Sequence, residues 1–376
     1  MPDIRLASLT RRFGDLTAVN DVTMTFPEGT VTCLLGPSGC GKTTLMRMIA
    51  GLEAPSSGRV IFGNREVTRL PARRRDVGMV FQYPVMYRTC SVQGNIELAL
   101  RGERLSETDR RRRIEDVLEI LQLGEYRDRQ IGDLDIGTRQ KVAVGRAIAR
   151  SCNVILFDEP TTNVDVHAKL QLIRAFKQFR LRFRQTIVYV THDQTEAMTL
   201  ADQIALMRDG VISQCSPPRQ LYEQPNTEFG GWFLGNPGMN FLSPRTERDG
   251  GVLFDIFPHP IVSPSGGGTD LRLGIRPEYI RVLPPAAPGL VQARVLRRCI
   301  TIGGQSLLTL AVGDARLKAK VAPEVAGRAG DQVSIDCPLE HVVFFRAGAR
   351  LPDAARALMP TEPVQAQNLR RAALGL

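Results

Sequence analysis

The segment that most constrains this chain is GPSGCGKTT at residues 36–44, which fits the pattern GxxxxGK[ST]. It follows an apolar run expected to form a strand, TVTCLL at 30–35, and opens a helical pattern that ends before Gly51. In such a loop the glycines permit a tight turn, and successive backbone N–H groups point at a bound phosphate. The helix N-terminus adds its positive end to the same site. The sequence therefore predicts a nucleotide-binding loop between a strand and a helix.

Individual loop positions carry different predicted roles. Lys42 would reach the β- and γ-phosphates, and the hydroxyl of Thr43 would hold magnesium. Cys40 is expected to be a small space-filling residue and not a nucleophile. The residues predicted to contact the nucleotide are Gly36, Pro37, Ser38, Gly39, Cys40, Gly41, Lys42, Thr43 and Thr44.

Two carboxylates follow a second apolar run, in VILFDE at 154–159. Asp158 would lie at the carboxyl end of that strand, where it can hold magnesium through water. Glu159 would be the general base for an attacking water molecule. Paired acids at a strand end can instead merely cap the next helix, but the phosphate loop favours catalysis. The two motifs together predict a site for a nucleotide phosphate and Mg²⁺ with a base for an attacking water.

The pattern of apolar runs divides the chain near residue 235. Up to there, runs without alternation, such as TIVYV at 186–190, are typical of parallel strands covered by helices. A helical stripe at 112–123 indicates a helical insertion over about 83–150. We therefore expect an α/β nucleotide-binding domain at 1–235.

The rest of the chain has a different sequence pattern. Short alternating runs such as QARVLRRCI, SLLTLAV and ARLKAKV, separated by Pro and Gly, are typical of a small β barrel or sandwich. We expect a β-rich regulatory domain at 236–352. A loose tail rich in Ala, Arg and Pro is expected at 353–376.

Charge and composition exclude several classes of protein. The 376 residues carry 49 Lys and Arg against 39 Asp and Glu, a net charge of +10 that only weakly favours an anionic partner. The arginine runs at 73–75 and 110–113 are expected to be solvated faces, and neither is interleaved with aromatic residues that would stack on single-stranded nucleic acid. No apolar run is long enough to span a membrane, and no signal peptide is evident at the start. Seven scattered cysteines without a CxxC pair predict reduced thiols.

The order of the motifs resembles that of ABC-type ATPases: the phosphate loop, Gln82, a degenerate signature at 134–138, VILFDEP, and His192 in YVTHD. More narrowly, the chain resembles ATP-binding subunits of bacterial importers for sugars, polyols and glycerol phosphate. GGWFLGNPGMNFL at 230–242 and LGIRPEYI at 273–280 resemble the C-terminal domain of that group, and FQYPVMY and PGMNF are similar to glycerol importers. The resemblance implies a P-loop ABC ATPase domain with a helical subdomain, followed by an all-β, OB-like (TOBE-type) domain.

The resemblance also implies roles for single residues. Phe13 matches the aromatic residue that stacks on adenine, and Gln82 matches the residue that meets magnesium and the attacking water and couples to the membrane subunits. His192 matches the sensor of the γ-phosphate, while Asn163 and Asp165 match the loop that crosses the dimer interface. The implied catalytic residues are Lys42, Gln82, Glu159 and His192, and the implied magnesium ligands are Thr43, Gln82 and Asp158.

The signature departs from the LSGGQ of this family. It reads Leu134, Asp135, Ile136, Gly137 and Thr138, and in the family it completes the ATP site of the other subunit. Asp135 would set a carboxylate against the γ-phosphate, and Ile136 places a branched side chain where close backbone approach needs glycine. We expect the site that this chain completes on its partner to hydrolyse ATP weakly. A heterodimer with a second ATPase that carries LSGGQ is predicted, with a homodimer as the alternative.

The resemblance therefore predicts the ATPase subunit of a polyol or sugar importer, with glycerol or glycerol phosphate favoured. Its expected partners are two transmembrane permease subunits and, indirectly, a periplasmic or surface substrate-binding protein, without nucleic acid. The expected location is peripheral, on the cytoplasmic face of the inner membrane. The alternatives are a soluble ABC ATPase acting on nucleic acid or ribosomes, a nucleic-acid-binding module, and a nucleotide kinase. The first usually has two ATPase halves or a long coiled insertion, and neither is evident.

Overall fold

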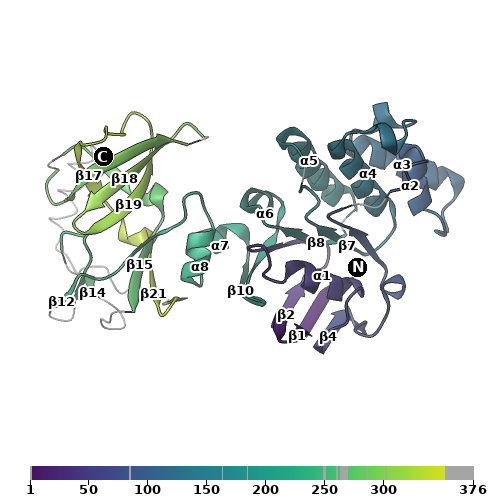
Figure 1. Cartoon of the computed structure of the whole chain (residues 1–376), viewed down its shortest axis with the longest axis horizontal. Helices are drawn as coiled ribbons and strands as arrows, with labels where there is room; N and C mark the ends of the chain where they lie inside the picture. The colour runs from purple at the N-terminus through teal and green to yellow at the C-terminus, as the bar shows by residue number, and fades with distance from the viewer. Residues whose placement is uncertain are drawn as a thin grey trace. The chain divides into compact units, whose positions relative to one another are not determined.

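The computed structural model describes residues 2–83, 86–162, 164–183, 185–248, 251–259, 261–262, 270–285, 287–301 and 303–351. The chain packs as two compact units, Met1–Arg219 and Gln220–Leu376 (Figure 1). The sequence placed this division later, near 235. The difference arises because the buried guanidinium of Arg276 donates hydrogen bonds to the carbonyls of Tyr222, Gly231 and Leu234, which ties that short segment to the second unit.

The centre of the first unit is a six-stranded sheet. Its strands, in spatial order, are β10 (Val211–Ser216), β9 (Gln203–Arg208), β3 (Val31–Leu35), β8 (Thr186–Thr191), β7 (Val154–Asp158) and β6 (Val77–Val80). All are parallel except β10, which pairs antiparallel with β9. Every residue of β3, β7 and β8 is buried, as their uninterrupted apolar sequences predicted.

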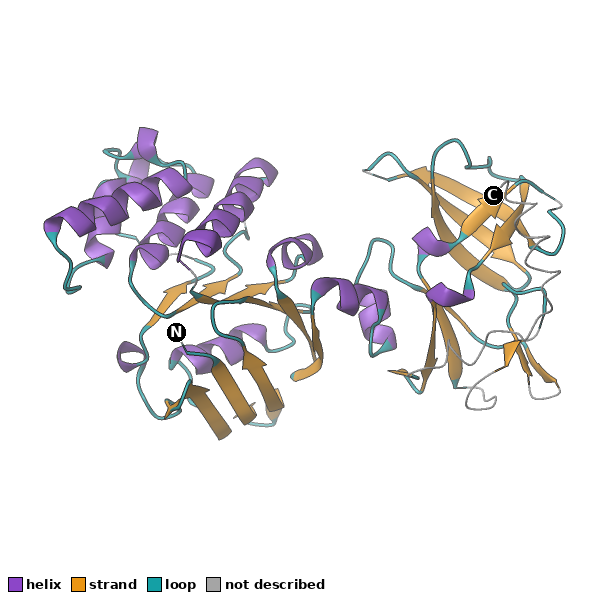
Figure 2. Cartoon of the chain, turned by 180° about the vertical axis from the view of Figure 1, so that it is seen from behind, coloured by secondary structure: helices purple, strands orange, loops and turns teal. Residues whose placement is uncertain are grey.

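A second, antiparallel sheet lies across α1 (Lys42–Ala50) from the first (Figure 2). Its strands, in spatial order, are β2 (Leu16–Phe26), β1 (Ile4–Phe13), β4 (Ser57–Phe62) and β5 (Arg65–Glu66). Buried side chains of both sheets and of α1 form one apolar cluster. This cluster fixes α1, and with it the phosphate loop, against the strands that carry the other site residues.

Helices lie on the opposite side of the parallel sheet (Figures 1 and 2). They are α2 (Val92–Ala99), α3 (Glu107–Ile120), α4 (Ile136–Ala149), α5 (Val166–Phe183) and α6 (Gln194–Leu200), with 3-10 turns at Ala72–Arg74, Gly124–Tyr126 and Ile131–Asp133. The last three helices pack against strands of the sheet, and α2 and α3 pack against α4. The first three lie in the helical insertion expected at 83–150. The helix α3 begins earlier than its apolar stripe because Ser106 caps its N-terminus, accepting the Asp109 N–H at 3.1 Å.

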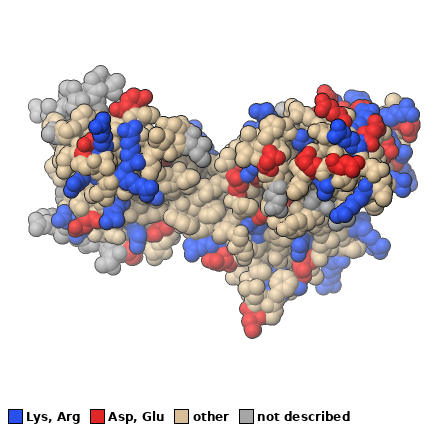
Figure 3. All heavy atoms as spheres, turned by 45° about the horizontal axis from the view of Figure 1, so that its top comes forward, with Lys and Arg blue, Asp and Glu red and all other residues tan. Residues whose placement is uncertain are grey.

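The two arginine runs are not wholly solvated, which corrects the expectation from sequence. Arg75 is buried and donates to the carbonyls of Met48 and Ile49, at the C-terminus of α1. Arg113 donates to the carbonyls of Ile148 and Ala149, at the C-terminus of α4. The last carbonyls of a helix lack partners and carry its negative end, so a cation stabilises them. The remaining basic side chains mix with acidic ones on the visible face of this unit (Figure 3).

The second unit is built of short antiparallel strands, as the sequence predicted. One sheet has the order β16 (Arg281–Leu283), β20 (Gln332–Asp336), β17 (Val291–Ile300), β18 (Ser306–Val312) and β19 (Ala315–Val321). Another has β11 (Asn240–Leu242), β15 (Leu271–Ile275), β21 (Val342–Arg346) and β22 (Ala349–Arg350), and a third has β12 (Thr246–Arg248), β13 (Gly251–Leu253) and β14 (Ile261–Val262). The helix α7 (Pro218–Glu223) begins just before the boundary between the units, and α8 (Glu228–Phe233) follows it, with 3-10 turns at Pro277–Tyr279 and Leu339–His341.

The alternating strands of this unit surround an apolar cluster that includes Phe254, Leu273, Leu308 and Phe344. The tail expected at 353–376 lies outside the described residues. No helix in the described part of the chain has the length and apolar character needed to cross a bilayer.

Candidate nucleotide-binding site

The phosphate loop connects the end of β3 to α1, and its glycines are required by close contacts. A Cβ atom at Gly36 would lie 2.1 Å from the carbonyl oxygen of Met207. Gly41 has φ +103°, and its Cβ would lie 2.2 Å from the carbonyl oxygen of Ala18. Gly41 is also the N-cap of α1, and among the described residues no side chain caps that end. The first N–H groups of α1 are thus available to an anion.

The ammonium group of Lys42 lies inside this loop. Lys42 is 4% exposed, and its Nζ donates to the carbonyl oxygens of Gly36 and Pro37, each at 2.9 Å. The Sγ of Cys40 is 3.8 Å from the same nitrogen. Burial raises the pKa of the Cys40 thiol, so the thiol stays protonated, as expected of a space-filling residue. The amine is therefore held at the loop where a phosphate would lie.

Thr43 and Asp158 meet although they are far apart in the sequence. The Thr43 Oγ1 donates to Asp158 Oδ1 at 3.0 Å, and Asp158 is 4% exposed at the carboxyl end of β7. Burial raises the pKa of Asp158. A hydroxyl beside a buried carboxylate is the oxygen set that Mg²⁺ prefers beside a phosphate, so the residues present fit that cation. Gln82 is half-buried on the loop after β6, and β6 pairs with β7, so Gln82 follows the strand next to Asp158.

The next residue, Glu159, contacts the predicted sensor histidine. Its Oε2 is 3.2 Å from His192 Nδ1 and accepts a hydrogen bond from Thr162 Oγ1 at 3.0 Å. Glu159 has φ +47°, and its backbone N–H donates to the Val190 carbonyl. A glutamate in the left-handed region is strained, and such strain concentrates at functional sites. The pairing of β7 with β8 brings Glu159 and His192 together. Thr162 was not predicted, although its hydroxyl three residues after Glu159 could have suggested this contact.

Phe13 ends β1 and is 43% exposed, so part of its ring is open to a ligand. The guanidinium carbon of Arg11 lies 4.4 Å from the ring centroid. The exposed part of the ring is suited to stacking on a purine, as the resemblance implied.

The degenerate signature begins α4, and Asp135 is its N-cap. One carboxylate oxygen accepts the Thr138 N–H at 2.8 Å, and the other accepts the Thr138 hydroxyl at 2.7 Å. These bonds hold the pKa of Asp135 below its usual value. Ile136 is 63% exposed beside it. The N-terminus of α4 therefore already has an anion of its own.

The signature lies against the segment predicted to cross the dimer interface. A Cβ at Gly137 would lie 2.9 Å from the Cβ of Ala168 and 3.6 Å from Val164, so α4 approaches the start of α5 closely there. Asp165 caps α5 by accepting the N–H groups of His167 and Ala168. Asn163, predicted for the same loop, lies outside the described residues.

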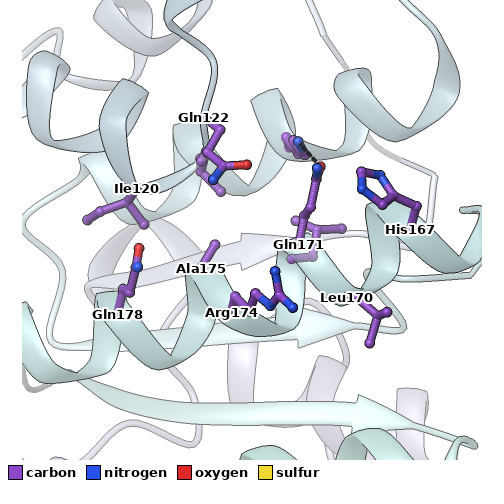
Figure 4. A pocket seen from close by; sticks show the side chains of 11 residues that line it. Ile120, Gln122, His167, Leu170, Gln171, Arg174, Ala175 and Gln178 are labelled. Carbon is purple, nitrogen blue, oxygen red and sulfur yellow. Dashed lines mark hydrogen bonds between the residues drawn. The ribbon is translucent and has the colours of Figure 1, made fainter.

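A pocket of about 310 Å³ lies between the end of α3 and α5 (Figure 4). Gln171 lines it and accepts a hydrogen bond from Lys141 at 2.5 Å, with His167 and Leu170 nearby on the same helix. Its described lining includes no residue of the phosphate loop, so this pocket is separate from the predicted ATP site.

Two known protein families match parts of this chain. Residues 19–162 match the ABC transporter family, and residues 273–345 match the TOBE domain. The sn-glycerol-3-phosphate import ATP-binding protein UgpC of Ruegeria pomeroyi is 39% identical over 82% of this chain and 86% of its own length. The UgpC of Chromohalobacter salexigens is 36% identical over 95% and 98%. The sulfoquinovosyl glycerol transport ATP-binding protein SmoE of Agrobacterium fabrum is 36% identical over 92% and 98%.

Among solved structures, the ATP-binding cassette MJ0796, a dimer in a post-hydrolysis state bound to ADP and Pi, has a TM-score of 0.52 at 27% identity. It covers 57% of this chain and 99% of its own. The fold and the family predicted from the sequence are confirmed, and the relatives' names do not favour a soluble ATPase acting on nucleic acid. The chain therefore belongs to the ABC transporter ATP-binding proteins, in the group of sugar and glycerol-phosphate import ATPases, and is an ATPase coupled to transport.

Proposed function

We propose that this chain powers an importer for a polyol or sugar, with glycerol or glycerol phosphate as the favoured cargo. The names of the relatives support this cargo class, because they refer to glycerol phosphate and sulfoquinovosyl glycerol. We further propose that the chain pairs with a second ATPase subunit whose signature is intact. The observation that carries this second proposal is the carboxylate of Asp135 at the start of α4.

At its own phosphate loop the chain would bind ATP and Mg²⁺. The loop N–H groups and Lys42 would hold the phosphates, Phe13 would stack on adenine, and Thr43, Asp158 and Gln82 would hold the cation. Bound magnesium would neutralise charge on the phosphates. Glu159 would orient the attacking water and accept its proton, and His192 would keep Glu159 directed at the γ-phosphate. The ATP site formed by these residues would need a phosphate-binding signature from another subunit.

Asp135 makes a second copy of this chain a poor supplier of that signature. Its carboxylate already occupies the N–H and hydroxyl of Thr138, the kind of donors that a γ-phosphate would use at a helix N-terminus. Two like charges 4 Å apart near a protein surface repel by about 4 kcal/mol. A clash of that size in the transition state corresponds to a rate loss of roughly a thousandfold. Pairing with a subunit that carries LSGGQ avoids this cost at the intact site.

The segment after Gln82 is proposed to dock on two permease subunits at the cytoplasmic face of the inner membrane. Tyr83 and Tyr87 are 73% and 54% exposed. Aromatic side chains are usually more buried than this in a folded domain. A groove of about 610 Å³ beside them is lined by Phe81, Met86 and Arg146, among others. Exposed aromatic residues beside a groove suit a protein partner. A periplasmic or surface substrate-binding protein would act on the permeases and not on this chain.

Purification of the full-length, tagged chain from its native membranes in mild detergent tests both proposals. We expect two membrane proteins and a second ATPase with an intact LSGGQ, and uptake of radiolabelled glycerol or glycerol phosphate after reconstitution. Membrane proteins without a second ATPase would overturn the heterodimer but keep the importer. Ribosomes or nucleic acid in place of membrane proteins would overturn the transport proposal.

A further inference from the structure

The first unit contains a buried carboxylate that none of the motifs above includes. Glu196 lies on α6 and is 0% exposed. Its Oε1 accepts hydrogen bonds from Thr161 Oγ1 and, at 2.8 Å, from Lys169 Nζ. Its Oε2 accepts the hydroxyls of Thr191 at 2.7 Å and Tyr189 at 3.1 Å. Each carboxylate oxygen thus has two donors.

These donors lie next to the segments that form the ATP site. Thr161 comes two residues after Glu159, on the loop that follows β7. Thr191 ends β8 and directly precedes His192. Lys169 is on α5, four residues after Asp165 of the predicted dimer loop. One carboxylate therefore links the general base, the sensor histidine and the dimer loop.

A second carboxylate strengthens the same network. Lys169 Nζ also bonds to Asp193 Oδ2 at 2.6 Å, and Asp193 caps α6 by accepting the N–H groups of Thr195 and Glu196. Burial alone would lower the pKa of Lys169, but Asp193 and Glu196 raise it overall, so the amine stays charged. A buried ion pair is tolerated only when its geometry and remaining hydrogen bonds are well satisfied.

Packing alone does not require a charge at this position. The surrounding side chains include Tyr189, which packs edge-on against Phe176 at 5.5 Å between ring centroids, and an apolar residue could fill such a site. What the carboxylate adds is directional contact with the hydroxyls of Thr161 and Thr191. Such contacts fix the position of the loop after β7, which contains Thr161, and of the segment after β8, which begins directly after Thr191.

We propose that Glu196 is a positioning residue for ATP hydrolysis, which holds Glu159 and His192 at their contact distance and the dimer loop against them. The proposal rests on the functions proposed above for Glu159 and His192. Glu196 does not touch the nucleotide, and it acts through the ends of β7 and β8 and the start of α5.

The direct test is Glu196→Gln in the full-length chain, purified with its membrane partners. The side chain keeps its shape, but one oxygen becomes an amide that cannot accept bonds from two donors. We expect kcat for ATP hydrolysis to fall about 10- to 100-fold while KM for ATP changes less than about twofold. The matched control is Glu119→Gln on α3, whose side chain is 77% exposed and which should leave both parameters unchanged. A Glu196→Gln enzyme with wild-type kcat would overturn the proposal.

A double-mutant cycle separates positioning from general weakening of the fold. In a His192→Ala background, Glu196→Gln should lower kcat by less than about twofold, because the Glu159–His192 contact that it positions is already lost. Independent effects that multiply would mean that Glu196 does not act through that contact and would overturn the proposal. If Glu196→Gln does not fold, Thr161→Val and Thr191→Val each remove one hydroxyl donor to Glu196 with little change of shape. Thr191→Val also removes the acceptor of the Asp193 N–H. Each should lower kcat several-fold while the chain stays folded at the assay temperature, and unchanged kcat in both would overturn the proposal.

The outcomes also distinguish this proposal from the function on which it rests. If Glu159→Gln leaves ATP turnover intact, the proposed site itself is wrong. If Glu159→Gln abolishes turnover and the Glu196, Thr161 and Thr191 variants do not reduce it, only the positioning role is wrong.

Discussion

The helices α1 and α4 begin with the same chemistry and use it in opposite ways. Each N-terminus presents backbone N–H groups without helical partners and the positive end of a helix dipole. At α1 the N-cap is Gly41, and among the described residues no side chain fills the position. At α4 the N-cap is Asp135, whose carboxylate accepts the Thr138 N–H. One helix is left open for a phosphate, and the other carries its own anion.

The two helix N-termini also differ in how much space they leave for a side chain. Gly41 has φ +103° and lies so close to Ala18 that no side chain fits. At α4 the residue after the N-cap, Ile136, is 63% exposed and presents a branched side chain outward. The N-terminus of α1 is thus open, and that of α4 carries its own carboxylate, so we expect only α1 of this chain to bind a phosphate well. Variants at the two sites test this difference.

The largest effect is expected from Glu159→Gln at the complete site. General bases contribute roughly 10²–10⁴-fold, so turnover of the assembled complex should fall by at least about a hundredfold, with ATP binding retained. Turnover and nucleotide binding of the complex would be measured together. The matched change at the other region, Asp135→Asn, should lower turnover far less. The reverse order of effects would contradict the assignment of one working site to this chain.

Backbone substitutions should show the next largest contrast. Gly41→Ala forces a Cβ to within 2.2 Å of a carbonyl oxygen at a positive φ, and should weaken ATP binding at least about tenfold. Gly137→Ala meets only side chains, the nearest at 2.9 Å, and φ there suits alanine in a helix. Equilibrium binding of a fluorescent ATP analogue would compare the two. Equal losses of affinity would mean that both helices contact nucleotide on the same chain.

Restoring the signature tests the heterodimer directly. In Asp135→Ser/Ile136→Gly, serine still caps α4, so stability should change little. If a partner with LSGGQ already completes one working site, the second site can at most about double the turnover of the complex. A rise of about tenfold or more would mean that both sites of the wild-type complex were impaired, as in a homodimer.

The sequence predicted local features better than contacts between distant segments. The loop at 36–44, β7 with its two acids, and the short strands of the second unit all follow from patterns within a few residues. Glu196 could not be recognised, because a glutamate in a short helix resembles a surface residue until four donors from other elements surround it. Arg75 was hidden in the same way, since its partners are carbonyls of α1. The sequence predicted that Asp135 would oppose a phosphate. It did not predict the hydrogen bonds by which Asp135 caps α4 through Thr138.

The smallest expected effects are on the stability of the fold. At neutral pH the ionised carboxylate of Asp158 should lower stability, and that of Asp135 should raise it. Burial raises the pKa of Asp158, so its ionised form costs stability at neutral pH, and this cost disappears below the unfolded-state pKa of about 4. Thr138 lowers the pKa of Asp135, so its ionised form stabilises the fold at neutral pH, and that gain is lost as the pH falls through the lowered value. Asp158→Asn should therefore raise the melting temperature of the ligand-free chain at pH 7, and the rise should shrink toward pH 4.

Asp135→Ala should do the opposite. Loss of an N-cap costs about 1 kcal/mol, or roughly 2–4 °C in a domain of this size, at pH 7, and the loss should narrow in acid. Melting of both variants and the wild type from pH 7 down to below pH 4, with and without Mg-ATP, would measure these differences. Mg-ATP should reverse the sign for Asp158→Asn alone, because ligand binding stabilises only the chain that keeps the buried carboxylate. A reversal at Asp135→Ala as well would mean that nucleotide reaches α4 of the same chain, and the contrast between the two helices would then be wrong.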